Sequence, residues 1–351
     1  MTNAARKEYL SLSPDAYSRF FICKELLKKN FNKTPIKLLD VGGGSKYFHQ
    51  ALDEDKLPYQ LTVIDLLPQN EKDPNYRYVQ GDATKMKFAD NSFDAVVSMD
   101  VLEHISDERK ANFLQECYRV AKDLVIIAAP FELPETDQAE RLANEFYRSL
   151  HDRDHPWLSE HFQQNKPKKE VIKKEIDQFG CSYIKFESNY LPDWLKIILV
   201  NFLPASLVDP VAVRDLNHFY NENLFSLDDF KEPGYRWFYV LYKNPKLAKK
   251  FDQYFKIEDS VFDQLTLEQK LTNLLTQQLL TTKVNLERKL AETAERLENM
   301  TKENVELAAQ LKDTVGHAGN LQKMLDDIHR SKAYKLARGL GSFHRKITGK
   351  L

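Results

Sequence analysis

Short apolar runs alternate with amphipathic stretches along the first two thirds of this sequence. The runs are bounded by Gly, Pro, Asn or Asp, which is typical of buried strands that end in turns. The stretches between them space their apolar residues as one face of a helix does, most clearly over 14–31 and 107–121. This alternation predicts an α/β fold with a mostly parallel, doubly wound sheet. Strands are expected at residues 36–41, 60–66, 76–80, 93–99, 124–130, 182–187 and 235–243.

The first apolar run leads directly into three glycines, Gly42, Gly43 and Gly44. Glycine allows positive φ and has no Cβ, so a ligand can lie against the backbone. In an open α/β sheet, ligands bind at the carboxyl ends of strands where the strand order reverses. The turn therefore predicts the floor of a nucleotide-type pocket. It is not a dinucleotide fingerprint, because the sixth residue from Gly42 is Tyr47, and no Gly-Lys-Ser/Thr of a Walker A loop follows.

Acidic residues recur near the ends of the expected strands, at Asp40, Asp65, Asp82 and Asp100. The carboxyl ends of parallel strands meet at one edge of the sheet, so these side chains are expected near the glycine turn. Asp65 follows the turn by about 20 residues, the separation at which an acidic side chain grips ribose hydroxyls in nucleotide-binding folds.

Four motifs in this order resemble those of the class I S-adenosylmethionine-dependent methyltransferases, especially a bacterial small-molecule and glycan branch. They are LLDVGGGS at 38–45, VIDL at 63–66, GDATKMKFADNSFDAVVSMDVLEHI at 81–105 and LVIIAAP at 124–130. The resemblance covers about residues 14–245. It implies a Rossmann-like, seven-stranded sheet whose last two strands form an antiparallel hairpin.

The resemblance also implies S-adenosylmethionine as the cofactor. Asp40 and the backbone of Gly42 to Gly44 would hold its methionine part, and Asp65 would bind the ribose. Asp82 and the Ala83 backbone would face the adenine. The implied cofactor-binding set is completed by Leu66 and Ser98. One departure is Lys46, which stands where the family often has a further glycine.

A hydroxyl acceptor of the methyl group would benefit from a general base, and two stretches offer one. In the first, Asp100, Glu103 and His104 share one face of a helical turn by their spacing. Some relatives with this pattern hold a divalent metal there, and two carboxylates with an imidazole are plausible ligands for Mg²⁺ or Mn²⁺. We favour the interpretation without a metal, in which Glu103 and His104 cap the loop, because spacing alone identifies no fourth ligand.

The second stretch, HDRDHPWLSEHF at 151–162, follows the fifth strand, where the family inserts acceptor-binding segments. Histidine is the side chain best suited to proton transfer near neutral pH. Trp157 and Phe162 are expected to form an apolar wall for the acceptor. The alternative is a surface loop whose tryptophan is merely packed. The predicted catalytic residues are His155, His161, His104 and Asp100.

The domain boundaries follow from changes in composition. Residues 1–250 are assigned to the methyltransferase domain, with an aromatic insertion at about 188–233 and a linker at 251–264. The insertion is interpreted as a packed subdomain, with a cap over the acceptor or a dimer surface as alternatives.

A seven-residue repeat occupies residues 265–330 and predicts a coiled coil, with a helix folded back on the catalytic domain as the alternative. A lone Asn304 in the core series favours a parallel homodimer in one register. One series is Leu286, Thr293, Met300, Leu307, Thr314, Leu321 and Ile328, and the other is Leu290, Leu297, Asn304, Leu311, Ala318 and Leu325.

The final stretch, residues 331–351, is basic and partly amphipathic, which suits a peripheral contact with an anionic membrane or a disordered tail. Its SKAYKLARGL segment resembles the end of many bacterial surface-polysaccharide glycosyltransferases and methyltransferases. A glycosyltransferase partner is therefore considered.

The overall composition limits the partners and the cellular compartment that we expect for this protein. The formal net charge is −1, so nothing attracts nucleic acid globally, and none is expected as a partner. Three widely spaced cysteines and the lack of an apolar leader or membrane-spanning run favour the cytoplasm. The expected function is methyl transfer to a hydroxyl of a sugar or lipid-linked glycan. The alternatives are methylation of an aromatic or quinone-like metabolite and a non-catalytic scaffold.

Overall fold

The computed structural model describes residues 3–31, 35–44, 46–54, 56–68, 74–163, 165–223, 225, 229–255, 261–332, 335–336 and 338–339. The chain forms two compact units, Met1–Gln278 and Leu279–Leu351.

Within its described residues, the first unit contains a seven-stranded sheet in the order β3-β2-β1-β4-β5-β7-β6. Strands β1 to β5 are parallel to one another, whereas β7 is antiparallel to both β5 and β6. The expected mixed sheet with an antiparallel last pair is therefore confirmed. The strands are β1 (Ile36–Val41), β2 (Tyr59–Asp65), β3 (Arg77–Gln80), β4 (Phe93–Met99), β5 (Ala121–Pro130), β6 (Ser182–Tyr190) and β7 (Gly234–Tyr242).

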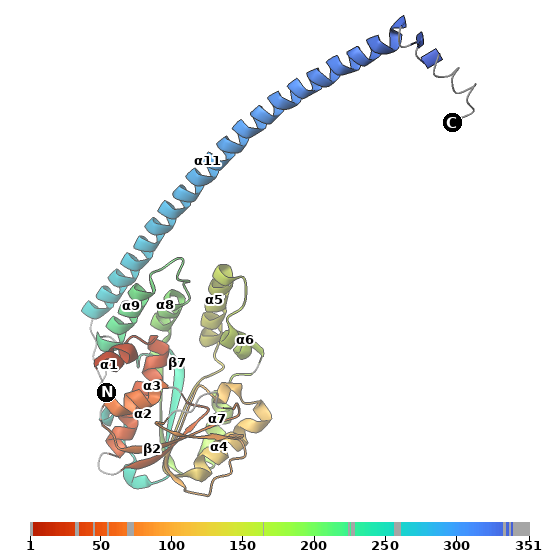
Figure 1. Ribbon diagram of the computed structural model, residues 1–351. Coiled ribbons are helices and arrows are strands. Elements are labelled where there is room, and N and C mark those ends of the chain that lie inside the picture. Colours follow the sequence, from red (N-terminus) through yellow and green to blue (C-terminus); the bar gives the residue numbers. More distant parts are fainter. Residues whose placement is uncertain are drawn as a thin grey trace, which may run out of the picture. The chain divides into compact units, whose positions relative to one another are not determined.

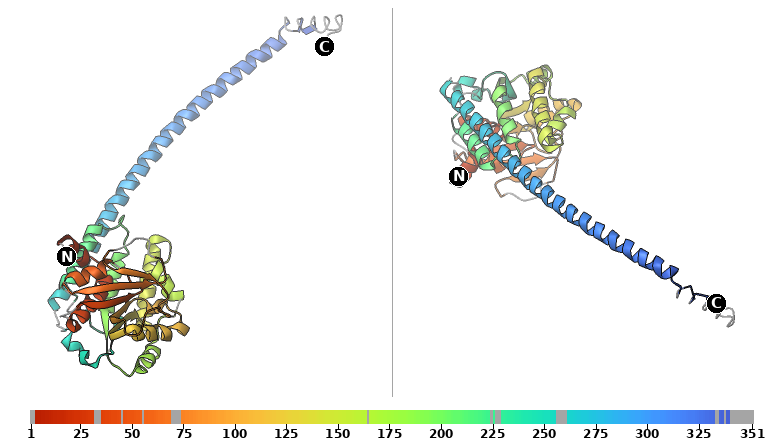
Figure 2. Two further views of the ribbon diagram at one scale, coloured as in Figure 1. Left: turned by 60° about the horizontal axis from the view of Figure 1, so that its bottom comes forward. Right: turned by 90° about the horizontal axis from the view of Figure 1, so that it is seen from above.

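Helices cover both faces of this sheet (Figures 1 and 2). Apolar side chains of α2 and α3 pack on one face, and those of α4 and α7 pack on the other. Two layers of helix thus bury a sheet whose central strands are apolar on both sides. The helices are α1 (Asn3–Leu10), α2 (Pro14–Asn30), α3 (Lys46–Glu54), α4 (Asp107–Val120), α5 (Pro134–His151), α6 (Pro156–Gln163), α7 (Lys169–Asp177), α8 (Leu191–Asn201), α9 (Pro210–Asn223) and α11 (Val261–Arg330), with short 3₁₀ turns η1 (Leu102–His104), η2 (Pro245–Leu247) and η3 (Phe251–Gln253).

The aromatic insertion consists mainly of α8 and α9. Its large rings are buried in the apolar clusters of the first unit, among them Trp194, Phe202, Tyr220 and Phe230. This agrees with a packed subdomain. Helix α8 also contacts α5, and it contributes to the cavity described below.

Helix α11 runs without a break from Val261 to Arg330. Leu267 and Leu271, near its start, are buried in the core of the first unit. The described leucines of the heptad series, such as Leu290 and Leu311, are exposed. A single long helix is thus present, and its pairing into a coiled coil stays a prediction. Most of the basic tail, including residues 340–351, lies outside the described residues.

A membrane-spanning segment is not found among the helices that the structure describes, since none is both long and apolar enough.

Candidate functional site

The glycine turn lies at the carboxyl end of β1, between β2 and β4, where the strand order reverses. Gly42 and Gly44 have φ values of 71° and 106°, in the left-handed region that favours glycine. A Cβ on Gly43 would lie 1.7 Å from Oδ2 of Asp40. The turn therefore requires glycine at all three positions and leaves its backbone open to a ligand.

Asp40 lies beneath this turn and is 2% exposed. Its Oδ2 accepts a hydrogen bond from the Gly44 amide at 3.3 Å, whereas its buried Oδ1 has no partner. Burial raises the pKa of Asp40 to about 7. A buried carboxylate oxygen without a partner is costly unless a ligand completes it. The ammonium group of a methionine moiety has the charge and the donors to do so, so these residues fit the implied cofactor.

The other predicted cofactor residues lie along the same edge of the sheet. Asp65 ends β2, and its Oδ1 accepts from the Leu67 amide at 2.8 Å. Leu66, beside it, is 69% exposed and offers an apolar surface to a flat ring. Ser98, near the end of β4, is buried, and its hydroxyl oxygen has no partner.

Asp82 is more constrained than the sequence suggested. Its Oδ1 accepts from the amide of Thr84 at 2.9 Å and from that residue's hydroxyl at 2.8 Å, while the Arg109 guanidinium donates to Oδ2. The hydrogen bonds from Thr84, followed by Arg109, lower the pKa of Asp82 despite some burial. Thr84 and Arg109 thus fix the Asp82 carboxylate and the adjacent Ala83 backbone.

A cavity of about 340 Å³ is lined by residues from α2, η1, α6, α8 and β7. Charged and imidazole side chains are prominent in its lining, whereas aromatic rings are few. Six ionisable side chains in this lining are considered below: Arg19, Asp100, Glu103, His104, His161 and Arg236.

The role of general base predicted for Asp100 is not supported. Arg236 donates to Oδ1 at 2.6 Å and to Oδ2 at 2.7 Å, and Arg19 also donates to Oδ2. Burial alone would raise the pKa of Asp100, but Arg236 and Arg19 bring it down to about 2. The carboxylate is therefore ionised with both oxygens occupied, and it is a poor acceptor for a further proton.

His161, on α6, is held by a carboxylate that the sequence analysis missed. Its Nδ1 lies 2.8 Å from Oε1 of Glu140, a fully buried residue of α5. Glu140 also accepts hydrogen bonds from the Tyr235 hydroxyl at 2.9 Å and from Lys166. An ionised Glu140 assigns the Nδ1 proton to His161 and leaves Nε2 for other work.

Glu103 and His104 lie on η1, immediately after Asp100. Glu103 is 1% exposed, and its Oε2 has no hydrogen-bond partner. Burial, followed by the charge of Asp100, raises the pKa of Glu103 well above its usual range. The His104 ring centroid is 5.5 Å from that of His161, and burial, followed by His161, lowers the pKa of His104. The two stretches proposed for catalysis therefore meet in one cavity.

His155 lies elsewhere, in an aromatic cluster with Tyr147, Trp157 and Phe202. Burial, followed by the nearby His151, lowers its pKa to about 4, so the ring is neutral at pH 7. It is not part of the cavity lining. The structure thus separates His155 from His161, although the sequence grouped them.

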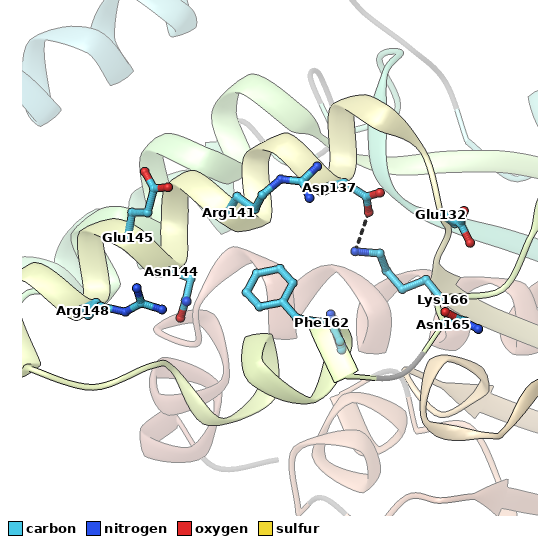
Figure 3. A pocket seen from close by; sticks show the side chains of 10 residues that line it. Glu132, Asp137, Arg141, Asn144, Glu145, Arg148, Phe162, Asn165 and Lys166 are labelled. Atoms are coloured by element: carbon cyan, nitrogen blue, oxygen red, sulfur yellow. Dashed lines mark ion pairs between the residues drawn. The ribbon is translucent and has the colours of Figure 1, made fainter.

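A second cavity, of about 420 Å³, lies between α5 and the segment that carries Phe162 and Lys166 (Figure 3). Figure 3 shows charged side chains of both signs around it, with Lys166 paired to Asp137 at 2.8 Å. His161 lines both cavities. Charged or imidazole groups therefore border the space on both sides of this histidine.

Comparison with known proteins finds a methyltransferase domain in the segment that contains the glycine turn. Residues 39–129 match the family model described as a methyltransferase domain. Over 91 residues the chain is 34% identical to a demethylmenaquinone methyltransferase of Renibacterium salmoninarum. That match takes in 24% of this chain and 37% of the relative, so the chain covers well under two thirds of the relative's length.

Solved structures show more distant likeness. A SAM-dependent methyltransferase from Archaeoglobus fulgidus is 20% identical with a TM-score of 0.37, covering 63% of this chain and 93% of that chain. A second solved structure is phosphoethanolamine N-methyltransferase 2 of Haemonchus contortus in complex with S-adenosyl-L-methionine. It is 18% identical with a TM-score of 0.40, and the match covers 65% of this chain and 57% of that chain. The predicted methyltransferase domain is confirmed over residues 39–129 by the family match.

Proposed function

We propose that this protein transfers a methyl group from S-adenosylmethionine to a hydroxyl of a polar, sugar-containing acceptor. The observation that carries the proposal is the unpartnered Asp40 oxygen beneath the glycine turn, inside the segment that matches a methyltransferase domain. A polar cavity with two imidazoles lies at the same carboxyl edge of the sheet.

The donor site uses groups from the first three strands. Asp40 and the backbone of Gly42 to Gly44 hold the methionine part, and Asp65 binds the ribose hydroxyls. Leu66 covers one face of the adenine, and Asp82 orients the loop at its edge. When bound, the cofactor supplies a methyl carbon activated by its sulfonium. The protein's own work is to align that carbon with the acceptor oxygen, since orientation supplies much of the catalysis of such a displacement.

The acceptor site is the cavity between η1, α6 and β7. His161 and His104 lie where an acceptor hydroxyl would enter, and Glu140 orients His161. Arg19 and Arg236 are balanced by Asp100 and Asp15 nearby, so the lining holds charged groups without excess charge. Activation of the hydroxyl is assigned to the part of the cavity that holds His104 and His161 rather than to Asp100.

The charged side chains in both cavities favour a sugar over a large apolar acceptor. Burying a charged lining against an apolar ligand would leave polar groups without water or partners, which is costly. A polyhydroxylated ligand can donate and accept at each of these groups.

A second candidate is a quinone-like aromatic acceptor. The demethylmenaquinone methyltransferase match favours it, as does Trp157 in the cavity lining, since an indole can stack on an aromatic ring. Transfer of labelled methyl groups to a panel of lipid-linked and nucleotide-linked sugars, beside demethylmenaquinone, separates the two. Labelling of sugars alone supports the first candidate, and labelling of the quinone alone overturns it.

The assembly of the protein is proposed from α11 and the tail. Two chains pair in parallel through residues 265–330, with Asn304 setting the register. The basic tail, residues 331–351, provides a peripheral contact with an anionic membrane, where a glycosyltransferase partner would supply the glycan. This arrangement suits an enzyme that acts on lipid-linked chains.

A further inference from the structure

We infer that Glu103, His104 and His161 form a binding site for one divalent transition-metal ion, with zinc as the best match. One ligand atom from each residue lies within 4.8 Å of the others. Glu103 and His104 come from η1, and His161 comes from α6, so the fold brings together donors that lie far apart in the sequence. Two imidazoles and one carboxylate are a donor set found in zinc sites that keep an open position.

The buried carboxylate is the first reason to expect a cation. Oε2 of Glu103 has no hydrogen-bond partner, although the residue is 1% exposed. The nearest arginines, Arg19 and Arg236, are both engaged by Asp100. A metal ion would give the Glu103 oxygen the partner that the protein does not supply.

The groups behind the histidines are the second reason. Nδ1 of His161 is held by Glu140 at 2.8 Å, and Nδ1 of His104 lies 3.3 Å from Oε2 of Glu160. Both Nε2 atoms are thereby left as ligands. Metal-bound histidines usually carry a carboxylate or carbonyl on the other ring nitrogen, which fixes the ring and its tautomer. Glu140 and Glu160 are positioning residues in this arrangement.

The three ligand atoms must move closer together to bind one ion. Bond lengths of about 2.0–2.2 Å at tetrahedral angles place neighbouring ligand atoms about 3.3 Å apart. The three ligand atoms must therefore approach one another by up to about 1.5 Å when the ion binds. His104 lies on a short 3₁₀ turn and is half-buried, so it has room to move. Asp100 has no place in the set, because its oxygens are bound by arginines.

The role of this ion rests on the proposed function. All three ligand residues line the acceptor cavity, so an ion held by them would bind an acceptor hydroxyl and make it lose its proton more readily. The proton passes to solvent, the acceptor oxygen bonds to the methyl carbon, and the electron pair of the broken carbon–sulfur bond stays on sulfur. The metal ion thus acts on the attacking oxygen, and the methyl donor supplies the carbon and the leaving sulfur.

The test measures metal content in the full-length protein. The chain is loaded with zinc, freed of excess ion by gel filtration, and analysed by elemental mass spectrometry. We expect about one zinc per chain in the wild type and less than a tenth of that in Glu103→Gln and His104→Ala. His218→Ala is the matched control: this histidine lies on α9 and pairs with Glu222, and its loss should leave the content unchanged.

Cobalt supplies a second readout that does not depend on activity. Four-coordinate Co²⁺, with two nitrogens and one oxygen from the protein and one oxygen from water, is expected to give a visible absorption band that both variants lose. Substoichiometric zinc in the wild type, or full zinc content in both variants, would overturn the proposal. Titration with S-adenosylhomocysteine checks that the variants are folded and keeps the two proposals apart. Zinc binding without any methyl transfer would leave this site standing and remove the proposed function.

Discussion

Replacing Gly43 by alanine tests whether the glycine turn is a cofactor site. The added Cβ would lie 1.7 Å from Oδ2, 2.0 Å from Cγ and 2.4 Å from Oδ1 of Asp40. Ordinary contacts between such atoms are about twice as long as the shortest of these. The carboxylate must therefore turn away from the position in which its Oδ1 faces the turn.

The expected loss follows from that displacement. A hydrogen bond to a charged group contributes about 1.5–3 kcal/mol, which corresponds to a rise in Kd of roughly 10-fold to 150-fold. Crowding beside the buried Asp40 should also lower the free energy of unfolding by about 1–3 kcal/mol. The variant is thus expected to remain folded while cofactor binding weakens strongly.

Isothermal titration calorimetry with S-adenosylhomocysteine measures the change, and thermal unfolding by circular dichroism reports the fold. The control is Gly316→Ala on α11, where an added Cβ meets no atom within 4 Å. Its affinity should equal that of the wild type. A folded Gly43→Ala protein with wild-type affinity would refute the assignment of this turn.

Three further predictions concern the buried carboxyls and the long helix. Burial raises the pKa of Asp40 to about 7, so the folded chain binds more protons than the unfolded chain between about pH 4 and pH 7. This group therefore lowers the free energy of unfolding as pH rises through that window. Asp40→Asn should raise Tm more at pH 8 than at pH 5, and equal shifts at the two pH values would contradict this. Glu140→Gln removes one of the two carboxylates that pair with the buried Lys166, so the free energy of unfolding should fall by about 2–4 kcal/mol. Methyl transfer should fall at least tenfold with unchanged cofactor affinity. Exposed Glu145→Gln on the same helix is its control, and equal effects of the two variants would remove the assigned role. Lysine at both Leu297 and Leu311 should convert a dimer of the full chain to a monomer in light scattering, whereas a wild-type monomer would eliminate the coiled coil.

The strands and the glycine turn could be predicted because their signals are local. The run before Gly42 is apolar, and Gly42 and Gly44 both adopt positive φ, which few other residues tolerate. The carboxyl-edge position of Asp40 and Asp65 then follows from the parallel arrangement of β1 and β2. Each inference needed only a short stretch of sequence and one rule of sheet topology.

The partners within the site could not be predicted, because they come from distant elements. Arg236 reaches Asp100 from β7, and Glu140 reaches His161 from α5. Such contacts leave no periodic pattern in the sequence, because they depend on how the helices pack on the sheet. The sequence grouped His155 with His161 by proximity, but His161 on α6 lines the cavity, whereas His155, which precedes α6, lies among aromatic rings.

The most direct test of the central claim is calorimetric titration of the full chain with S-adenosylmethionine and S-adenosylhomocysteine, beside Asp65→Ala. Asp65 ends β2 with a half-exposed carboxylate, so its removal should leave the fold intact. The account predicts micromolar binding by the wild type and none detectable in the variant at the same concentrations. Absence of binding to folded wild-type protein, or equal binding by both proteins, would contradict it.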